Sequence, residues 1–544
     1  MTLAGLLERA VLRRPAADAV VDGPRRLDYA GLERRTAVLG AGFRRLGVAH
    51  GDRVLLALRN RLEHVLTYWT LQRLGAVAVP INFRLAASEI HYLLTDSGAG
   101  IALCEPATAA AVSEAATGTA TRLVHVGAAA PPGALQWEEL LGEDPPGPQP
   151  GEGAGQERLA PGDGSAANEV LSAGPSPTPD PRVTEHDLSL ILYTSGTTGR
   201  PKGVPRTHRN HYAGAVAHVV QCGYTWGERT LGVMPLYHTM GIHALTSMVA
   251  VNGCFVCQPD WSPAGALALI AAERITALYL IPTLFYDLVH APGFAAADAA
   301  SVTKLAFAGA PMLGSLTDAC VRAFRPAVFV NHYGSTEIYT FSVRPDVHDK
   351  PGCAGRPGLH TRLRVVQASS ERRVSPEEVV APGAKGEIVA ALDSAEAFAG
   401  YWNRPDADAR ALRDGWYFTG DMGYVDEAGE LWVSGRVDDM IISGGENIHP
   451  VEVEEVLARH PGVRDVAVVG QPDERWGERV VAFVVPGQAG LTAEVLDAWC
   501  RSGGELAPFK RPRRVVFVQE IPKTASGKIL RRLLREGRYA EMTT

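Results

Sequence analysis

The stretch LILYTSGTTGRPKGV, residues 190–204, decides both the fold and the chemistry of this chain. It opens on an apolar run typical of a buried strand and continues into a loop of glycine, serine and threonine that leads to Lys202. Glycine lets a backbone approach an anion closely, and hydroxyl and free N–H groups donate to phosphate oxygens. Lys202 adds a mobile positive charge. The stretch therefore predicts a strand followed by a polyphosphate-binding loop.

This loop differs from the P-loop of kinases and ATPases, where lysine directly follows the second glycine. Here Lys202 stands three residues after Gly199. Taken alone, such a segment is also compatible with an ordinary surface loop. The longer string from Thr194 to Val204 is more specific, and it resembles the phosphate loop of the acyl-adenylate-forming superfamily. That superfamily includes acyl-CoA synthetases, luciferases and the adenylation domains of peptide synthetases.

Length and composition favour a multidomain globular enzyme. The chain has 544 residues, of which 46% are hydrophobic and 21% charged, and its formal net charge is −7. Single cores rarely grow beyond ~250–300 residues, so we expect more than one domain. The negative charge argues against a broad nucleic-acid surface. No apolar run approaches the ~20 residues that span a bilayer, and the N-terminal segment lacks a secretory signature, so we expect a cytoplasmic protein without a membrane partner.

The seven cysteines are scattered and odd in number, which favours a reducing compartment. Cys254 and Cys257 have C-x-x-C spacing but stand in a strand-like apolar segment. Neither a second pair nor a histidine ligand pattern follows them. They are therefore predicted to be core thiols rather than zinc ligands or a redox pair.

Strand and helix signals alternate over residues 1–104 and again after the phosphate loop, which predicts parallel sheets covered on both faces. Residues 231–237 read as a buried strand leading to His238. Residues 128–183 are rich in proline, glycine and serine, and we expect a mobile insertion there. Residues 363–390 are strand-rich, and after Arg436 the pattern restarts as a smaller unit.

The predicted fold class is therefore α/β. We expect a large N-terminal adenylate-forming domain, residues 1–437, of parallel or mixed sheets flanked by helices, with a small β-barrel-like part. A small mobile C-terminal α+β domain, residues 438–544, completes the chain.

Four further motifs of the superfamily occur in this sequence. The first is YGSTE, residues 333–337, where the resemblance implies that Thr336 contacts the AMP phosphate and Glu337 holds Mg²⁺. A carboxylate beside a triphosphate requires a hard cation between them, since like charges repel. The alternative is a turn with a solvated glutamate.

The other three motifs are WYFTGD (416–421), GRVDD (435–439) and PKTASGKI (522–529). By the resemblance, Asp421 accepts hydrogen bonds from the ribose. Arg436 contacts ribose and phosphate, and Asp438 occupies the hinge between the domains. Lys528 matches the catalytic lysine, which offsets charge between the substrate carboxylate and the α-phosphate. The alternatives are surface loops with salt-bridged charges and, for Lys528, a solvated lysine.

Three residues are expected to be catalytic by this resemblance: Lys528, Glu337 and Thr194. The residues expected to bind ATP or AMP are Thr194, Ser195, Gly196, Thr197, Thr198, Gly199, Lys202, Tyr333, Gly334, Thr336, Asp421 and Arg436.

Residues 438–450, 475–477 and 509–512 narrow the resemblance to the branch of 4-chlorobenzoate–CoA ligase and related aryl-CoA ligases. It implies a coenzyme A site in which Gly445 lines the pantetheine tunnel, while Trp476 and Phe509 pack the adenine. Arginine binds phosphate through its planar fork. The arginines expected to meet the CoA phosphates are Arg84, Arg511 and Arg513.

For the acyl group, the resemblance places His238 over the substrate, and Ala308 and Gly309 along a small wall. His332, Tyr339 and Thr340 depart from the chlorobenzoate pattern. They imply a more polar and shorter pocket, and hence a small aromatic or heteroaromatic acid.

The predicted activity is an ATP-dependent carboxylate–CoA ligase that works through an acyl-AMP intermediate, with ATP, Mg²⁺ and coenzyme A, and with a homodimer as its expected assembly. A medium-chain fatty acid–CoA ligase and an enzyme that loads a carrier protein are the alternatives within this chemistry. A binding protein without catalysis is a third, but it predicts loss of Lys528, Glu337 or Asp421, and all three are present.

Overall fold

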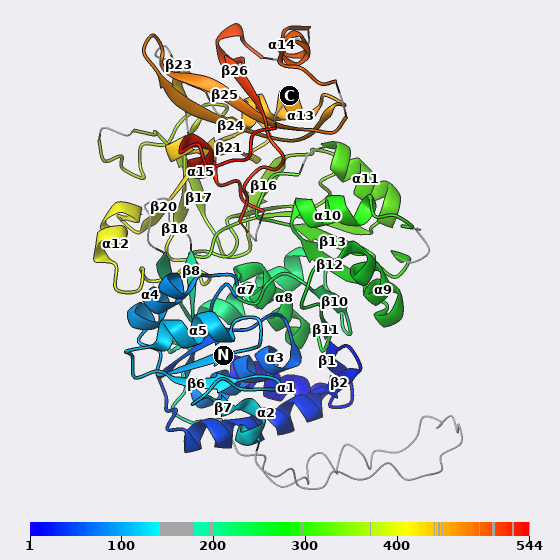
Figure 1. Cartoon of the computed structure of the whole chain (residues 1–544), viewed down its shortest axis with the longest axis vertical. Coiled ribbons are helices and arrows are strands. Elements are labelled where there is room, and N and C mark those ends of the chain that lie inside the picture. The colour runs from blue at the N-terminus through cyan, green and yellow to red at the C-terminus, as the bar shows by residue number, and fades with distance from the viewer. Residues whose placement is uncertain are drawn as a thin grey trace.

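The computed structural model describes residues 1–141, 179–194, 201–294, 299–312, 314–369, 372–439, 441–443, 446–448, 450–488, 490–502, 506–524 and 527–542. These residues form two large β-sheets packed with helices and a smaller sheet near the C-terminus (Figure 1). The predicted α/β fold class is confirmed.

The first large sheet carries the strand that leads into the phosphate loop. Its strands are β3 (Arg53–Ala57), β4 (Val77–Pro80), β5 (Ile101–Cys104), β6 (Arg122–His125), β7 (Leu135–Gln136), β8 (Leu188–Thr194) and β9 (Lys202–Thr207). Their order is β7-β6-β5-β3-β4-β8-β9, and the strands are parallel except for the β8–β9 hairpin.

Both faces of this sheet are buried, as its continuous apolar strands predict. In β3, Val54 and Leu56 join one core cluster, while Leu55 and Ala57 join another. Helices α4 (Ala87–Ser97) and α5 (Ala109–Ala116) cover the second face, and α2 (Tyr29–Arg45) and α3 (Leu62–Leu74) cover the first. Every residue of α3 is buried, because this helix lies in the core that the two large sheets share.

The second large sheet continues from parallel strands into an antiparallel part that corresponds to the predicted β-rich region. Its order is β17-β18-β20-β21-β16-β15-β14-β13-β12-β10-β11-β1-β2, with β19 on β20. The bounds are β1 (Asp18–Asp22), β2 (Arg25–Asp28), β10 (Arg229–Gly232), β11 (Cys254–Cys257), β12 (Ala277–Leu280), β13 (Lys304–Phe307), β14 (Val328–Tyr333), β15 (Ser342–Arg344), β16 (Cys353–Pro357), β17 (Leu363–Val366), β18 (Gly386–Ala391), β19 (Leu412–Arg413), β20 (Trp416–Val425) and β21 (Leu431–Arg436).

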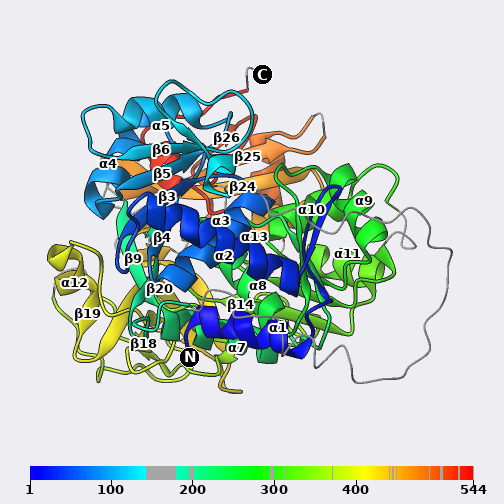
Figure 2. The ribbon, with the colours of Figure 1, turned by 90° about the horizontal axis from the view of Figure 1, so that it is seen from below.

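Helices pack on both sides of the parallel part, and Figure 2 shows α1, α2 and α3 from below. Within the described residues, no helix has both the length and the apolar character needed to cross a bilayer. The remaining helices of the N-terminal part are α1 (Leu3–Arg13), α7 (His208–Gln221), α8 (Thr239–Ala250), α9 (Pro263–Glu273), α10 (Pro282–Val289), α11 (Gly314–Phe324) and α12 (Pro405–Ala411).

The C-terminal unit has a sheet and a core of its own, drawn in orange and red at the top of Figure 1. A salt bridge between Lys385 and Glu452 joins it to the larger part. Its elements are η3 (Val437–Asp439), β22 (Ile441–Ser443), β23 (Glu446–Ile448), α13 (Pro450–Ala458), β24 (Val463–Asp473), β25 (Gly477–Pro486), α14 (Ala493–Ser502), η4 (Pro508–Lys510), β26 (Arg514–Phe517) and α15 (Arg531–Arg535).

All seven cysteines are buried thiols without disulfide bonds. Cys254 and Cys257 lie on β11, so the prediction of core thiols is confirmed.

Two segments differ from the sequence prediction. The strand expected over residues 231–237 ends at Gly232. Beyond it the chain turns, because Pro235 lacks an N–H for a ladder and α8 already begins at Thr239, with His238 as its N-cap.

Part of the region expected to be a mobile insertion, residues 128–183, forms regular structure. Within it, β7 pairs with β6, and a 3-10 helix η1 (Trp137–Leu140) follows. Trp137 and Leu140 are each only 4% exposed, because their spacing puts both side chains on the face of η1 that meets the core. Residues 142–178 of the predicted insertion lie outside the described residues.

Gly75 provides a test of how tightly α3 is held. It ends the helix at φ +67°, and an added Cβ would lie 2.4 Å from His50 and 2.6 Å from Val183. Gly47 has a similar φ of +82° but open space around it. We expect Gly47→Ala to cost ~1–2 kcal/mol from backbone strain, and Gly75→Ala ~1–3 kcal/mol more from overpacking. Urea unfolding of both variants measures this difference in the free energy of unfolding. Equal decreases in stability for the two variants would contradict the described packing around Gly75.

Candidate active site

The phosphate-loop hairpin places Thr194 and Lys202 opposite each other. Thr194 ends β8, Lys202 begins β9, and the two are register partners. Burial lowers the pKa of the Lys202 ammonium group, and the nearby charge of Glu337 opposes that shift. The rest of the predicted loop lies outside the described residues: Ser195, Gly196, Thr197, Thr198 and Gly199.

The YGSTE segment turns sharply at the end of β14. A Cβ on Gly334 would lie 1.8 Å from the carbonyl oxygen of Tyr339, so only glycine fits there. Arg206 on β9 supports this turn from below. Its Nη1 donates to the carbonyl oxygens of Thr336 at 2.9 Å and Glu337 at 3.0 Å. Arg206 was not predicted from the sequence, although an arginine directly after Val204 and Pro205 was a possible signal.

Tyr401 positions the carboxylate of Glu337. Its hydroxyl donates to Oε1 of Glu337 at 2.7 Å, and Lys202 Nζ lies 4.1 Å from the centre of its ring. Trp402 N donates to Gly203 O at 2.8 Å, which fixes this segment on β9. Tyr401 was not predicted from the sequence, where the string GYW at residues 400–402 was the available signal.

The residues expected at the ribose also meet. The hydroxyl of Tyr333 donates to Oδ2 of Asp421 at 2.6 Å. Asp421 and Arg436 are register partners on β20 and β21, with Nη1 3.4 Å from Oδ1. Burial disfavours the guanidinium charge, but Asp421 and nearby phenols outweigh it and raise the pKa of Arg436.

Lys528 reaches this group from the C-terminal unit. The preceding Gly527 lies against the N-terminal part, since an added Cβ would be 3.0 Å from Ile281. Burial and the charge of Arg436 lower the pKa of Lys528, while Asp421, Asp439 and Glu337 act in the opposite direction. The structure therefore brings residues of the phosphate loop, YGSTE, WYFTGD, GRVDD and PKTASGKI segments to one place.

The predicted coenzyme A residues fall into separate groups. Arg513 stacks on Trp476 with 5.3 Å between the guanidinium carbon and the ring centre, and Arg475 lies 4.8 Å from the same ring. Phe509 is 37% exposed, and Arg511 pairs with Asp497 at 2.8 Å. Arg84 lies in the N-terminal part, exposed beside Phe83. Gly445 lies outside the described residues, as does the side chain of the predicted hinge residue Asp438 in η3.

The residues expected around the acyl group are mostly buried. His238 caps α8, and Ala308 and Gly309 follow β13 directly. His332 and Tyr339 have ring centres 5.0 Å apart, and Gln221 donates to Nε2 of His332 at 3.1 Å and to Thr340 Oγ1 at 3.4 Å. Burial lowers the pKa of His332 to about 3 and that of His238 to about 4, so both imidazoles are neutral at neutral pH.

A buried polar network behind these residues was not predicted from the sequence. The hydroxyl of Tyr339 lies 2.9 Å from His218 Nδ1 and 3.2 Å from the hydroxyl of Tyr279. Its ring stacks on His243 with 3.5 Å between centres. These groups stand far apart in sequence, so only the fold shows that they meet.

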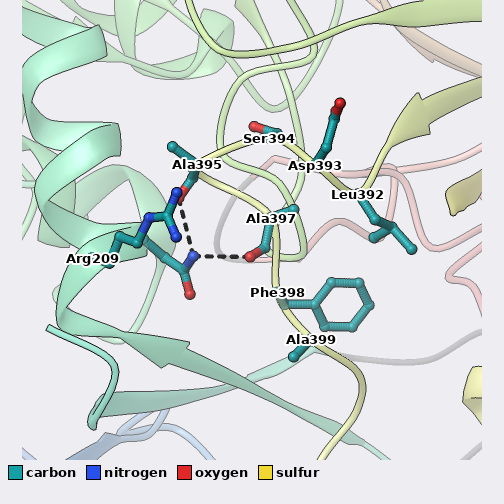
Figure 3. Close-up of a pocket in the computed structure, with 9 residues that line it drawn as sticks. Arg209, Leu392, Asp393, Ser394, Ala395, Ala397, Phe398 and Ala399 are labelled. Carbon is teal, nitrogen blue, oxygen red and sulfur yellow. Dashed lines mark hydrogen bonds between the residues drawn. The ribbon is translucent and has the colours of Figure 1, made fainter.

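A surface cavity of about 370 Å³ lies beside this site rather than in it (Figure 3). At its edge, Asn210 Nδ2 donates to the carbonyl oxygens of Ala395 and Ala397 at 3.0 and 2.9 Å. None of the predicted site residues lines it. The lining residues are Arg209, Asn210, Leu392, Asp393, Ser394, Ala395, Ala397, Phe398 and Ala399.

Comparison with known protein families gives two matches. Residues 7–402 match the AMP-binding enzyme family, and residues 452–528 match the AMP-binding enzyme C-terminal domain. These matches confirm the superfamily resemblance deduced from the motifs.

Among curated relatives, a feruloyl-CoA synthase from Amycolatopsis is 36% identical, over 95% of both chains. A 4-chlorobenzoate–CoA ligase from Arthrobacter is 35% identical, over 96% of this chain and 93% of that protein. A long-chain-fatty-acid–CoA ligase from Mycobacterium tuberculosis is 34% identical, over 90% and 89%. An anthranilate CoA ligase solved with anthranoyl-AMP superposes with a TM-score of 0.84 at 25% identity, over 99% of this chain and 97% of that one.

Tyr401→Phe tests the support of Glu337. Loss of a hydrogen bond to a carboxylate costs ~1.5–3 kcal/mol, so we expect kcat/KM for ATP to fall about tenfold to a hundredfold. Steady-state kinetics with varied ATP and Mg²⁺ measures this. Tyr29→Phe, which removes a phenol that donates to Met248 O and Gly253 O, is the matched control. Equal kinetics in both variants would show that the Tyr401 hydroxyl does not position the carboxylate.

Proposed function

The chain belongs to the AMP-binding enzyme family, and we propose that it joins a small aromatic or heteroaromatic carboxylic acid to coenzyme A through an acyl-adenylate. One observation carries this proposal. Lys528, from the small unit, lies close enough to Glu337, Asp421 and Arg436 for their charges to act on its ammonium group. A cation placed among nucleotide-binding groups can stabilise charge that develops between a carboxylate and a phosphate.

The reaction has two steps. In the first, a carboxylate oxygen attacks the α-phosphorus of ATP, the bond to the bridging oxygen breaks, and diphosphate leaves. In the second, the sulfur of coenzyme A attacks the acyl carbon, the thiol proton passes to solvent, and AMP leaves. Acid, ATP and coenzyme A thus become acyl-CoA, AMP and diphosphate.

The residues at the site suit the first step. Lys528 would bridge the acid carboxylate and the α-phosphate, and Lys202 and Thr194 would bind the phosphates that leave. Asp421 would accept hydrogen bonds from the ribose hydroxyl groups. Both lysines are partly buried, and this desolvation lowers their pKa values. The same shielding from water strengthens the attraction between a protonated lysine and a bound anion.

Mg²⁺ fits the surroundings of Glu337. The carboxylate is 6% exposed and Tyr401 binds only one of its oxygens. Mg²⁺ commonly takes one or two carboxylates and completes its shell with phosphates and water. Among the described residues no group of three or more histidine, cysteine or acidic side chains could hold a metal, so ATP and water would supply the other ligands. The ion would neutralise phosphate charge.

Coenzyme A as the acceptor is supported by the group around Trp476. The half-buried indole of Trp476, flanked by Arg475 and Arg513, offers a stacking surface and two guanidinium groups. Aromatic rings stack on nucleobases and arginine pairs with phosphate, as the nucleotide end of coenzyme A requires. A carrier protein remains the second acceptor to test.

The two steps need different groups at the acyl carbon, so we propose that residues 438–544 rotate as a domain about Asp438. Glu452 forms salt bridges with Lys385 of the larger part and with Lys510 of its own unit. Rotation would break the Lys385–Glu452 pair, keep the Glu452–Lys510 pair and withdraw Lys528.

The acid class is supported by the polar groups among the candidate acyl residues. His332, Tyr339 and Thr340 all belong to hydrogen-bonded networks, whereas a long aliphatic chain would need apolar walls. Relatives named for aromatic acids support this choice, and the relative named for long-chain fatty acids keeps an aliphatic acid as the alternative.

A panel of acids tests the reaction class. Purified protein with ATP, Mg²⁺ and coenzyme A is incubated with benzoate, 4-hydroxybenzoate, ferulate, nicotinate, octanoate and palmitate, and products are identified by mass. We expect an aryl-CoA together with AMP, and loss of at least about a hundredfold in adenylate formation for Lys528→Ala. Adenylate without thioester would point to a carrier protein. Octanoyl-CoA as the main product would contradict the aromatic assignment.

His332→Ile tests the polar pocket. Loss of a hydrogen-bonding imidazole should lower kcat/KM for 4-hydroxybenzoate about tenfold, with a smaller change for benzoate. Because the pKa of His332 is about 3, the imidazole stays neutral and this selectivity should not change between pH 6 and pH 8. Steady-state kinetics at both pH values measures it, with His348→Ile as the exposed control. Faster turnover of 4-hydroxybenzoate by His332→Ile would overturn this assignment.

A further inference from the structure

The end of the β3–α3 connection and the first residue of α3, residues 59–62, reach from the first large sheet to the second. Arg59 Nη1 pairs with Asp260 at 2.6 Å, beyond the end of β11. The backbone N–H of Leu62 donates to Asp22 Oδ2 on β1 at 3.0 Å. Asn60, between them, enters the interior and is only 4% exposed. Arg59 and Leu62 thus contact the second large sheet at two places, beyond β11 and on β1, and Asn60 lies between these two contacts.

Both the Nδ2 and the Oδ1 of the Asn60 side chain form hydrogen bonds with one stretch of backbone, residues 232–236. Its Nδ2 donates to the carbonyl oxygens of Gly232 and Met234, both at 2.8 Å. Its Oδ1 accepts from the N–H of Leu236 at 2.9 Å. An aspartate at this place would have no donors for the two carbonyl groups, so the arrangement requires an amide of this length.

The stretch that Asn60 binds leads directly to His238. Gly232 ends β10, and its carbonyl oxygen also accepts from the N–H of Gln258 at 3.2 Å. The residues after Gly232 have left the sheet and lack its ladder of hydrogen bonds. The Asn60 amide contacts every second residue along this stretch, as a neighbouring strand would. His238 N then donates to Pro235 O at 2.9 Å, and α8 begins. The position of His238 therefore depends on the backbone that Asn60 holds.

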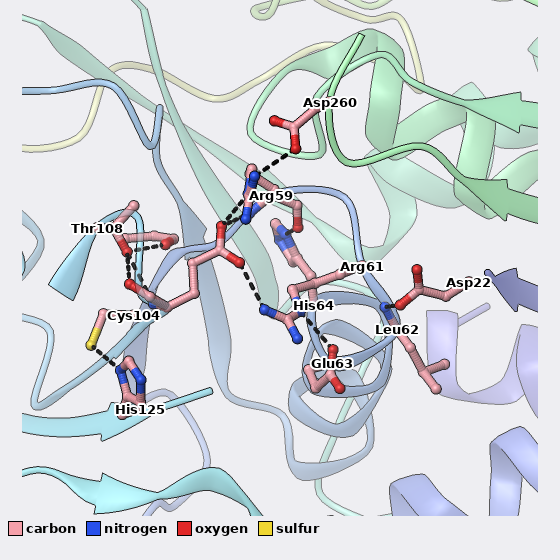
Figure 4. A network of polar contacts seen from close by, with 12 residues as sticks. Asp22, Arg59, Arg61, Leu62, Glu63, His64, Cys104, Thr108, His125 and Asp260 are labelled. Atoms are coloured by element: carbon pink, nitrogen blue, oxygen red, sulfur yellow. Dashed lines mark hydrogen bonds and ion pairs between the residues drawn. The ribbon is translucent and has the colours of Figure 1, made fainter. Parts of the chain in front are cut away.

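Glu105 binds the residues on both sides of Asn60, Arg59 and Arg61, whose side chains are labelled in Figure 4. This carboxylate is fully buried. Its Oε1 accepts from the backbone N and the Nε of Arg59 at 3.1 and 2.9 Å, and its Oε2 accepts from Nη1 of Arg61 at 2.8 Å. Hydrogen bonds between buried ions are strong and directional, so the backbone on either side of Asn60 has little freedom.

We propose that Asn60, held by Glu105, is a positioning residue for the acyl substrate. It sets the place of His238 at the start of α8, and through it the affinity and choice of the acid. This inference rests on the proposed function, since it takes His238 to border the acyl group. Asn60 itself does not touch the nucleotide-binding groups described above, so ATP binding is expected to be independent of it.

Asn60→Asp tests this inference, with Asn252→Asp as the matched control. Asn252 is also a buried asparagine that donates to a backbone carbonyl, Ala10 O at 2.7 Å, and accepts from Arg13 Nε at 2.9 Å. The assay is ATP–diphosphate exchange driven by the aromatic acid of the panel that gives the fastest reaction. We expect KM for the acid to rise about tenfold to a hundredfold in Asn60→Asp, with KM for ATP within about threefold of wild type. Asn252→Asp should leave both constants unchanged.

A second readout separates positioning from general stability. In a His238→Ala background, Asn60→Asp should raise KM for the acid by no more than about threefold, because both changes remove the same interaction. If Asn60→Asp does not fold, Asn60→Ser and Glu105→Gln take its place with the same expectation. Equal changes in KM for acid and ATP, or full additivity with His238→Ala, would overturn the inference. Failure of every acid in the panel would instead refute the proposed function.

Discussion

The candidate site depends on one buried cation that joins the two large sheets. Arg206 lies on β9, within the hairpin that carries the phosphate loop, and binds the carbonyl groups of Thr336 and Glu337 beyond the end of β14. Burial lowers the pKa of its guanidinium to about 10, yet the group remains charged at neutral pH. The phosphate loop and the expected metal ligand therefore keep a fixed relation, although they belong to different sheets.

Several charged side chains lie close to this link and are partly shielded from water. Partial burial lowers the pKa values of Lys202 and Lys528, and the negative charge of Glu337 acts on both ammonium groups in the opposite direction. Asp421 and Arg436 form a pair at 3.4 Å beside them. Buried charges are costly unless they are paired, and a bound nucleotide carries the negative charge that two lysines and an arginine can balance. The positive charges at this site would therefore be better balanced with a polyphosphate bound than without one.

Local patterns were sufficient to predict the fold class, most element positions and the motif residues, because strand and helix periodicity and short strings act over a few residues. They failed where distant segments decide the outcome. The proline and glycine residues near residue 130 led to the prediction of a mobile segment there, although Trp137 is buried. Its burial depends on packing against α3, where its Nε1 donates to Thr67 Oγ1. Tyr401, Arg206 and Asn60 were missed for the same reason, since their partners lie 64, 130 and 172 residues away in sequence. No single-sequence pattern encodes those contacts.

The central claim is that a carboxylate oxygen of the acid attacks the α-phosphorus of ATP. It is tested most directly with an acid labelled with ¹⁸O in its carboxylate, which is turned over with ATP, Mg²⁺ and coenzyme A before the nucleotide is analysed by mass. The account predicts that one labelled oxygen appears in the phosphate of AMP. AMP without label, or label in orthophosphate or diphosphate, would contradict it.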